Sequence, residues 1–255
     1  MSSVSLPDLV RYCDQLLAVG EFADYCANGL QVDGRSPVRK IVTGVSACRE
    51  LFVRAAQLGA DSVLVHHGLL WKAQASSPIT GFQYQRLKTL IESGLSLVSY
   101  HLPLDAHAEV GNNALAARGL GLSDLQRFGR HEGSLIGFRG RFEDPLPVSE
   151  LVARCIRLFG QAPLAFAHGP DPVSTLGLIS GGAQREFHEA IELGLDAYLT
   201  GEASEWVQNV SRESGVHYLA AGHYATERLG IGALGEHLAR RFDIEAVFVD
   251  VPNPV

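Results

Sequence analysis

The chain has 255 residues, of which 46% are hydrophobic and 19% are charged. This balance is typical of a folded globular protein and excludes a long disordered chain. The chain carries 21 Lys and Arg residues against 28 Asp and Glu residues, so its formal net charge is −7. An acidic chain is a poor candidate for binding duplex nucleic acid through its phosphates. No apolar stretch approaches the roughly 18 residues needed to cross a bilayer, so no membrane partner is expected.

The N-terminal segment and the cysteines together predict a cytoplasmic protein. The first segment carries Asp8 and Asp14 and lacks the basic start and apolar block of a secretory signal. The cysteines form no C-x-x-C pair, and most lie in apolar or helical surroundings, as reduced buried thiols do. These cysteines are Cys13, Cys26, Cys48 and Cys155.

The first half of the chain alternates between helical and strand patterns. A helix is predicted over 6–19, with Ser5 as its N-cap and Pro7 in its first turn. The following predicted elements are a strand over 40–46, a helix that ends near Gly59, a strand over 62–67, a helix to about Glu92 and a strand over 95–100. This order predicts an α/β fold with a largely parallel sheet.

The second half resembles the first. Leu146-Pro147 precedes a helical pattern as Leu6-Pro7 does, and ESGVHYLAAGH resembles ESGLSLVSYH. We therefore predict two similar α/β halves related by internal duplication, 1–127 and 128–255, with a metal site in the cleft between them. The alternative is that any two β-α-β units look alike.

Four groups of polar residues directly follow predicted strands, where open α/β sheets bind their ligands. They are His66-His67, His101 with Asp105, Glu202, and His223 with Glu227. Under the duplication, His101-x-x-x-Asp105 corresponds to His223-x-x-x-Glu227, since 223 − 101 and 227 − 105 are both 122. Residues four apart share one face if a helix begins there. Both pairs are therefore expected to face a common cleft.

Five of these side chains are candidate metal ligands: His66, His67, Asp105, His223 and Glu227. A closed tetrahedral zinc site needs only four ligands. Five mixed nitrogen and oxygen ligands suit either one crowded octahedral ion or two ions with a bridging carboxylate. Two divalent ions would favour a bridging hydroxide and an anionic substrate group such as phosphate. The ligand types suit Zn, Fe, Mn, Co or Ni, and the identity of the metal stays open.

The remaining histidines and Glu202 have a simpler interpretation. A lone histidine is more often structural than a ligand, and this applies to His131, His168, His188, His217 and His237. Glu202 stands where His67 stands in the duplicated frame. Glu202 could orient one of the metal ligands without binding the metal itself, or it could be an acidic residue at the start of a helix.

At these residues the sequence resembles the Nif-three-like family of dinuclear metal proteins, whose members are often called GTP cyclohydrolase 1 type 2 homologues, in their compact bacterial form. The motifs that carry the resemblance are NGLQVDG (28–34), HHGLLW (66–71), YHLPLDAH (100–107), GNN (111–113), TGE (200–202) and GHYATE (222–227). Gly68 departs from the proline that many members have after the histidine pair. The resemblance implies the same five metal ligands with Glu227 bridging two divalent ions per subunit. It also implies a homohexameric toroid with the metal sites facing an internal cavity.

The function expected from residues and resemblance together is a dinuclear-metal-dependent hydrolase. It would act on a nucleotide or another phosphorylated small molecule through a metal-bridging hydroxide. His101 is the candidate for orienting a ligand or relaying a proton, ahead of His107 and Glu109. The alternative is a non-catalytic metal-binding, regulatory or metal-handling protein that uses the same ligands. Nucleic-acid binding is disfavoured, because Arg35, Arg39 and Lys40 are too few to form a basic stripe.

Overall fold

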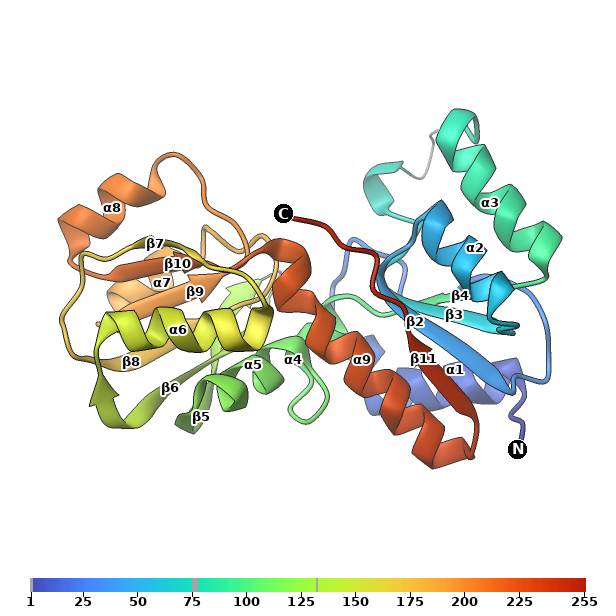
Figure 1. The fold of residues 1–255 in the computed structure, drawn as a ribbon, viewed down its shortest axis with the longest axis horizontal. Helices are drawn as coiled ribbons and strands as arrows, with labels where there is room; N and C mark the ends of the chain where they lie inside the picture. Colours follow the sequence, from blue (N-terminus) through green and yellow to red (C-terminus); the bar gives the residue numbers. More distant parts are fainter. Residues whose placement is uncertain (1, 75–77, 132) are drawn as a thin grey trace. The chain divides into compact units, whose positions relative to one another are not determined.

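The structure is a computed structural model that describes residues 2–74, 78–131 and 133–255. It divides into two compact units (Figure 1), of which the first comprises Met1–Leu104 and Gly230–Val251 and the second comprises Asp105–Leu229 and Pro252–Val255. These units differ from the predicted halves 1–127 and 128–255. Residues 105–127 cluster with the second unit because α5 (Asn112–Leu120) packs on its strands, and residues 230–251 return to the first unit.

The first unit is built on a sheet with the order β1-β4-β3-β2-β11. The strands β4, β3, β2 and β11 run parallel, while β1 is antiparallel to β4. The strands are β1 (Gly29–Val32), β2 (Lys40–Ser46), β3 (Ser62–His67), β4 (Ser96–Ser99) and β11 (Glu245–Phe248). The helical segments are α1 (Leu6–Leu16), η1 (Val19–Glu21), α2 (Arg49–Gln57), η2 (Lys72–Gln74) and α3 (Gly81–Ser93).

The helices of the first unit begin where the sequence predicts. The Ser5 side chain accepts a hydrogen bond from the Asp8 N–H, and Pro7 lies in the first turn of α1. The helices α2 and α3 lie side by side (Figure 1) and cover one face of the sheet, where Phe52 and Leu90 pack against Val63. All three side chains are fully buried, so the predicted helices and strands of this half pack their apolar faces into one core.

The second unit is built on a sheet with the order β5-β6-β8-β9-β10-β7. The strands β8, β9 and β10 run parallel, and the other neighbours are antiparallel. The strands are β5 (Leu122–His131), β6 (Ser134–Leu146), β7 (Leu164–Phe166), β8 (Val173–Leu178), β9 (Ala197–Thr200) and β10 (His217–Ala220). The helices besides α5 are α6 (Val148–Phe159), α7 (Phe187–Glu192) and α8 (Val207–Ser214).

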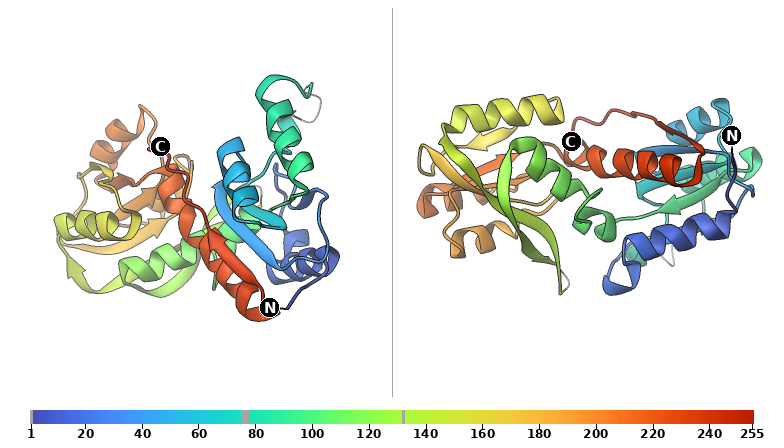
Figure 2. Two further views of the ribbon diagram at one scale, coloured as in Figure 1. Left: turned by 45° about the vertical axis from the view of Figure 1, so that its right-hand side comes forward. Right: turned by 90° about the horizontal axis from the view of Figure 1, so that it is seen from below.

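Helices cover both faces of the second sheet. In the right-hand view of Figure 2, α6 lies on one side of the sheet, and α7 and α8 lie on the other. On the first side, Leu151 and Phe159 of α6 pack into a core with Leu199. On the second side, the ring of Phe187 lies 5.7 Å from that of Tyr198 and 4.9 Å from that of Tyr218. The sheet is therefore buried on both faces, as parallel α/β sheets are.

The two sheets share one feature of strand order. In each unit, three parallel strands lie side by side in chain order, β2-β3-β4 in the first and β8-β9-β10 in the second. The strand latest in the sequence of each three, β4 or β10, also pairs with an antiparallel strand, β1 or β7. This agrees with a mixed α/β fold and is compatible with duplication, which stays a prediction. The chain passes from one unit to the other within two helices, α4 (Leu102–Ala106) and α9 (His223–Phe242), and again between Val251 and Pro252.

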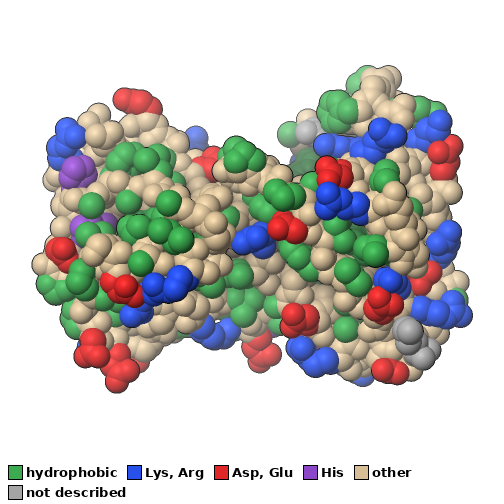
Figure 3. Space-filling model, in the orientation of Figure 1, with side chains coloured by type: hydrophobic (Ala, Val, Ile, Leu, Met, Phe, Trp, Pro, Cys, Tyr) green, Lys and Arg blue, Asp and Glu red, His purple; other side chains and the backbone are tan. Residues whose placement is uncertain are grey.

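On the face shown in Figure 3, acidic and basic side chains are interspersed over the first unit. Throughout the residues that the structure describes, no helix combines the length and the apolar character that a membrane span requires.

Candidate metal centre

Three histidines of the first unit come together at the carboxyl ends of neighbouring parallel strands. His66 and His67 end β3, and His101 follows β4 directly before α4. The ring centroids lie 4.7 Å apart for His66 and His67, 5.1 Å for His66 and His101, and 5.7 Å for His67 and His101. A ligand nitrogen of each ring lies within 4.8 Å of one on each of the others, so these rings form a group that could hold a metal ion.

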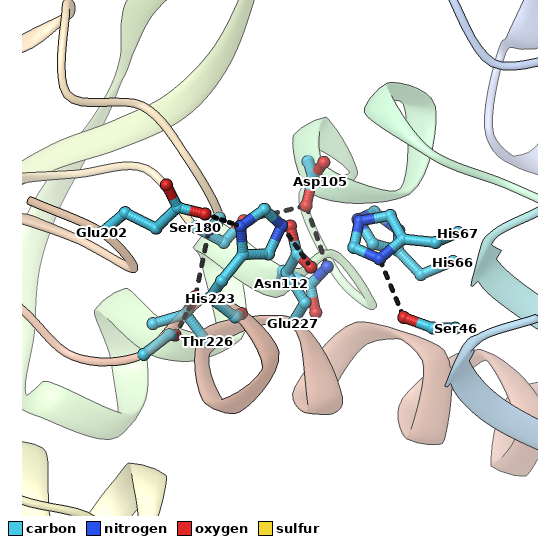
Figure 4. A network of polar contacts seen from close by, with 12 residues as sticks. Ser46, His66, His67, Asp105, Asn112, Ser180, Glu202, His223, Thr226 and Glu227 are labelled. Carbon is cyan, nitrogen blue, oxygen red and sulfur yellow. Dashed lines mark hydrogen bonds and ion pairs between the residues drawn. The ribbon is translucent and has the colours of Figure 1, made fainter. Parts of the chain in front are cut away.

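Each of these rings is oriented by a hydrogen bond at Nδ1. Nδ1 of His66 donates to the carbonyl oxygen of Tyr100 at 3.0 Å, and Nδ1 of His67 lies 3.1 Å from the Ser46 hydroxyl (Figure 4). A carbonyl oxygen can only accept, so the proton of neutral His66 lies on Nδ1. In this tautomer the lone pair lies on Nε2, and hydrogen bonds of this kind fix the tautomer and orientation of metal-binding imidazoles.

Asp24 performs this task for His101 and was not identified from the sequence. Its Oδ1 accepts from Nδ1 of His101 at 2.9 Å, and its Oδ2 accepts from the N–H of Leu102 at 3.0 Å. Asp24 is 6% exposed. Burial alone would raise the pKa of Asp24, but the hydrogen bond and charge of His101, with hydrogen bonds from Cys26 and Asn28, lower it to about 2.

We expect Asp24→Asn to lower the free energy of unfolding by about 2 kcal/mol at pH 7. The pKa of Asp24 is lower in the folded protein than its ordinary value of 3.8. Its stabilisation is therefore complete above about pH 4 and is lost as the pH falls toward 2. Urea unfolding of the metal-free protein between pH 2 and pH 7 measures the difference. A difference that stays constant down to pH 2 would contradict the assigned cause.

In the second unit, Asp105 is held by two buried polar groups. Its Oδ1 accepts from Nδ2 of Asn112 and from the hydroxyl of Ser180, each at 2.9 Å (Figure 4). The neighbouring Asn113 accepts a hydrogen bond from the Ser180 N–H at 2.6 Å. The Gly-Asn-Asn motif at the start of α5 thus fixes the strand end that carries Ser180 and the carboxylate that faces it.

His223 and Glu227 lie on the first turn of α9, one helical turn apart. Nε2 of His223 lies 3.2 Å from Oε2 of Glu227, which confirms the predicted spacing of four residues on one helical face. Nδ1 of His223 donates to Oε1 of Glu202 at 2.6 Å, and Oε2 of Glu202 accepts from Gln184 at 2.9 Å. Glu202 therefore orients His223, and this answers the question that the sequence left open.

The electrostatic surroundings of His223 favour its protonated form while no metal is bound. Burial alone would lower the pKa of His223, but hydrogen bonds and charges of Glu227 and Glu202 raise it to about 9. A divalent cation can take the place of that proton between the same carboxylates.

The turn Ser180-Gly181 brings the acidic ligands of the second unit together. Ser180 contacts Asp105, and a Cβ atom built on Gly181 would lie 2.3 Å from Oε1 of Glu227. A carboxylate oxygen of Asp105 lies within 4.8 Å of one of Glu227. Two buried carboxylates this close repel each other unless a proton or a cation lies between them. The predicted ligands Asp105, His223 and Glu227 are thus neighbours in this unit.

Several histidines interpreted as structural have structural partners. Both ring nitrogens of His217 are hydrogen-bonded to the backbone of 169–170, and Nε2 of His237 lies 2.7 Å from the Tyr12 hydroxyl. The ring of His188 stacks on Trp206 at 5.2 Å. The predicted five-residue ligand set takes His66 and His67 from the first unit and the other three from the second, and it stays a prediction.

Comparison with known proteins assigns the family. The model of the Duf34/NIF3 (NGG1p interacting factor 3) family matches residues 4–254. A Pseudomonas aeruginosa protein named GTP cyclohydrolase 1 type 2 homolog is 42% identical over 252 residues, which cover 99% of each chain. An Escherichia coli protein of the same name is 42% identical over 248 residues, 97% of this chain and 98% of that protein.

Solved structures agree with this assignment. The structure of the protein ybgI, described as of unknown function, matches with a TM-score of 0.93 and 40% identity. The match covers 99% of this chain and 100% of that chain. A Thermus thermophilus protein has a TM-score of 0.90 and 38% identity, with coverage of 99% and 100%. With a family match over nearly its whole length and relatives above 40% identity, this chain belongs to the DUF34/NIF3 family.

Proposed function

We propose that this protein is a metal-dependent hydrolase that holds two divalent cations with His66, His67, Asp105, His223 and Glu227. The observation that carries the proposal is the position of His223 between two carboxylates. Its Nδ1 lies 2.6 Å from Oε1 of Glu202 and its Nε2 lies 3.2 Å from Oε2 of Glu227, an arrangement in which a divalent cation can replace the imidazolium proton. In the first unit, the hydrogen bond from Nδ1 of His66 to a backbone carbonyl orients a second imidazole in the way that supporting hydrogen bonds orient metal ligands.

The donors fit divalent transition metals. Imidazole nitrogens and carboxylate oxygens suit Zn, Fe, Mn, Co and Ni. In the second unit, Gly181 leaves open the space beside Glu227 that a side chain would fill. Glu227 is 3% exposed and Asp105 is 4% exposed, and a buried carboxylate needs a charge partner. Glu227, which lies between His223 and Asp105 in this unit, is the residue we assign as the bridging ligand.

Two divalent cations held by these residues would supply a water molecule of lowered pKa and would polarise the bond under attack. The remaining roles fall to the protein. Asp24 holds His101 with Nδ1 protonated, so Nε2 of His101 is the atom at which a proton is accepted and returned. Glu202 keeps His223 in one orientation throughout.

The charge balance favours an anionic substrate. Two divalent cations carry +4 and the two ligand carboxylates carry −2, which leaves +2 to be matched. A phosphorylated small molecule such as a nucleotide meets this need. We also propose a homohexameric assembly and a cytoplasmic location, as the family resemblance and the cysteines imply. Light scattering in solution tests the assembly.

The proposal is tested by elemental analysis combined with a substrate panel. Purified protein is expected to contain up to two divalent transition-metal ions per subunit and to hydrolyse at least one nucleotide or phosphoester when loaded with Zn, Mn, Fe, Co or Ni. Chelation should abolish turnover, and readdition of metal should restore it. Protein that binds metal but turns over no member of the panel would favour the metal-handling alternative, and protein that binds no transition metal would overturn the proposal.

A further inference from the structure

The first unit contains a cavity that the ligand set does not use. Its volume is about 550 Å³, within the range of roughly 300–1,000 Å³ that small-molecule sites occupy. One wall follows the histidine pair directly and is formed by Gly68, Leu69 and Trp71. The other wall comes from Ile79 and the first turns of α3, where Phe82 and Arg86 lie. The cavity lies wholly within residues of one unit.

The wall beside the histidines is rigidly held. Oε1 of Gln31 accepts from the N–H groups of Leu69 and Leu70 at 2.7 and 3.2 Å. Nε2 of Gln31 donates to the carbonyl oxygen of Ala27 at 2.7 Å, and Nε1 of Trp71 donates to that of Gly68 at 2.9 Å. A wall fixed by its own hydrogen bonds is preformed for a ligand, which reduces the entropy lost on binding.

The lining combines apolar surface with positive charge. Phe82 is 67% exposed and Ile79 is 61% exposed, so two large apolar side chains that line the cavity are also open to solvent. The guanidinium of Arg86 lies 5.1 Å from the centroid of the Phe82 ring, and Lys72 also lines the cavity. Hydrophobic and basic side chains gather over α3 at the upper right of Figure 3. Among its described lining residues the cavity has no carboxylate, although the chain as a whole is acidic.

The cavity also adjoins the three histidines. The ring of Trp71 lies edge-on to His101 with centroids 5.3 Å apart, and it lies 6.0 Å from His67. We infer that this cavity binds an aromatic molecule that carries an anionic group, with the ring against Phe82 and Trp71 and the anion at Arg86 and Lys72. Aromatic and apolar side chains bind the flat body of such a ligand, and a guanidinium binds its carboxylate or phosphate.

This inference deepens the proposed function, because it assigns the class of substrate that reaches the histidines. That the bound molecule is a substrate rests on the proposed function, whereas its binding to the cavity does not. The volume of about 550 Å³ and the concave lining favour a small ligand over a second copy of the chain, because stable interfaces between proteins bury about 800 Å² of surface on each partner.

Isothermal titration calorimetry on chelator-treated protein tests the binding with three probes. The probes are naphthyl phosphate, naphthol and inorganic phosphate, so the ring and the anion are separated. We expect naphthyl phosphate to bind at least about tenfold more tightly than either of the other two. Equal affinity for all three probes, or no binding of naphthyl phosphate, would overturn the inference.

Two variants assign the binding to this cavity. Arg86→Gln should weaken naphthyl phosphate about tenfold and leave naphthol unchanged, and Phe82→Ala should weaken both. The controls on the same helix are Lys88→Gln and Ile91→Ala, because Lys88 pairs with Glu92, Ile91 is 66% exposed, and neither lines the cavity. Controls that weaken binding as much as the test variants would place the probe elsewhere and overturn the inference.

The remaining readouts separate this inference from the proposed function. Metal content should be unchanged in Arg86→Gln and Phe82→Ala. Protein that binds naphthyl phosphate as expected but holds no metal would overturn the proposed hydrolase and leave the cavity assignment standing. Protein that holds metal but does not bind naphthyl phosphate would overturn the cavity assignment and leave the proposed hydrolase standing. If Phe82→Ala changes the oligomeric state while affinity for naphthyl phosphate is unaffected, the cavity is a surface between copies, and the inference fails.

Discussion

Glu227→Gln is expected to remove at least one divalent cation per subunit and to lower any hydrolytic rate at least about 1,000-fold, because several kcal/mol of transition-state stabilisation depend on the cations. Glutamine keeps the size of the side chain and removes its charge. Glu227 lies within reach of both His223 and Asp105 in the second unit, so its loss affects more than one ligand contact. Elemental analysis and initial rates on the same preparation measure both effects.

A control on the same helix is Glu236→Gln, whose side chain is 76% exposed. It should retain the metal and the rate. His67→Ala should reproduce the loss of metal although His67 belongs to the other unit. If His67→Ala leaves the metal content unchanged while Glu227→Gln abolishes it, the five residues do not form one centre, and the proposed ligand set is wrong.

Gly181→Ala is expected to lower metal affinity about 100-fold while destabilising the fold by only about 1–2 kcal/mol. Gly181 has a φ of +68°, which costs an L-residue energy wherever it occurs. The added Cβ would also lie 2.3 Å from Oε1 of Glu227 and 3.3 Å from Nε2 of His223. The end of the Glu227 side chain can swing away at modest cost, but it then leaves its place as a ligand.

Gly194→Ala supplies the matched control for backbone strain. Gly194 has a φ of +65°, and an added Cβ would meet nothing within 4 Å. The two alanine variants should therefore lose similar amounts of stability in urea unfolding of the metal-free protein. Only Gly181→Ala should lose metal affinity in a competition titration with a chelator. Equal metal affinity in both variants would show that Gly181 does not position Glu227.

Local patterns in the sequence located the elements of the site accurately. The strand predicted over 62–67 is β3 with the same bounds, and α9 begins at His223 as the spacing of His223 and Glu227 requires. These features depend on side chains close in sequence, so apolar runs and helix-start signals are sufficient to find them. The two i, i+4 pairs are less alike than the duplication predicts. His223 and Glu227 contact each other at 3.2 Å within one unit, whereas His101 belongs to the first unit and Asp105 to the second.

The carboxylates that orient the histidines could not be found in this way. Asp24 reaches His101 across 77 residues and Glu202 reaches His223 across 21, and no local periodicity connects either pair. The strand end before Glu202 gave a position for that residue but no partner, and the segment around Asp24 carries no motif that points to His101. Such contacts are set by the tertiary fold. The unit boundaries likewise depend on α9 and β11, whose final placement follows from packing rather than from sequence similarity.

The place of β11 in the first sheet has a consequence for synthesis on the ribosome. The second unit is assembled almost entirely from the continuous stretch Asp105–Leu229, so its sheet can close before translation ends. The first unit starts earlier but must wait for Glu245–Phe248 to pair with β2. Until then β2 is an unprotected edge rich in buried β-branched residues, and such edges invite pairing with other nascent chains. The part of the protein that is translated first is therefore the part that matures last.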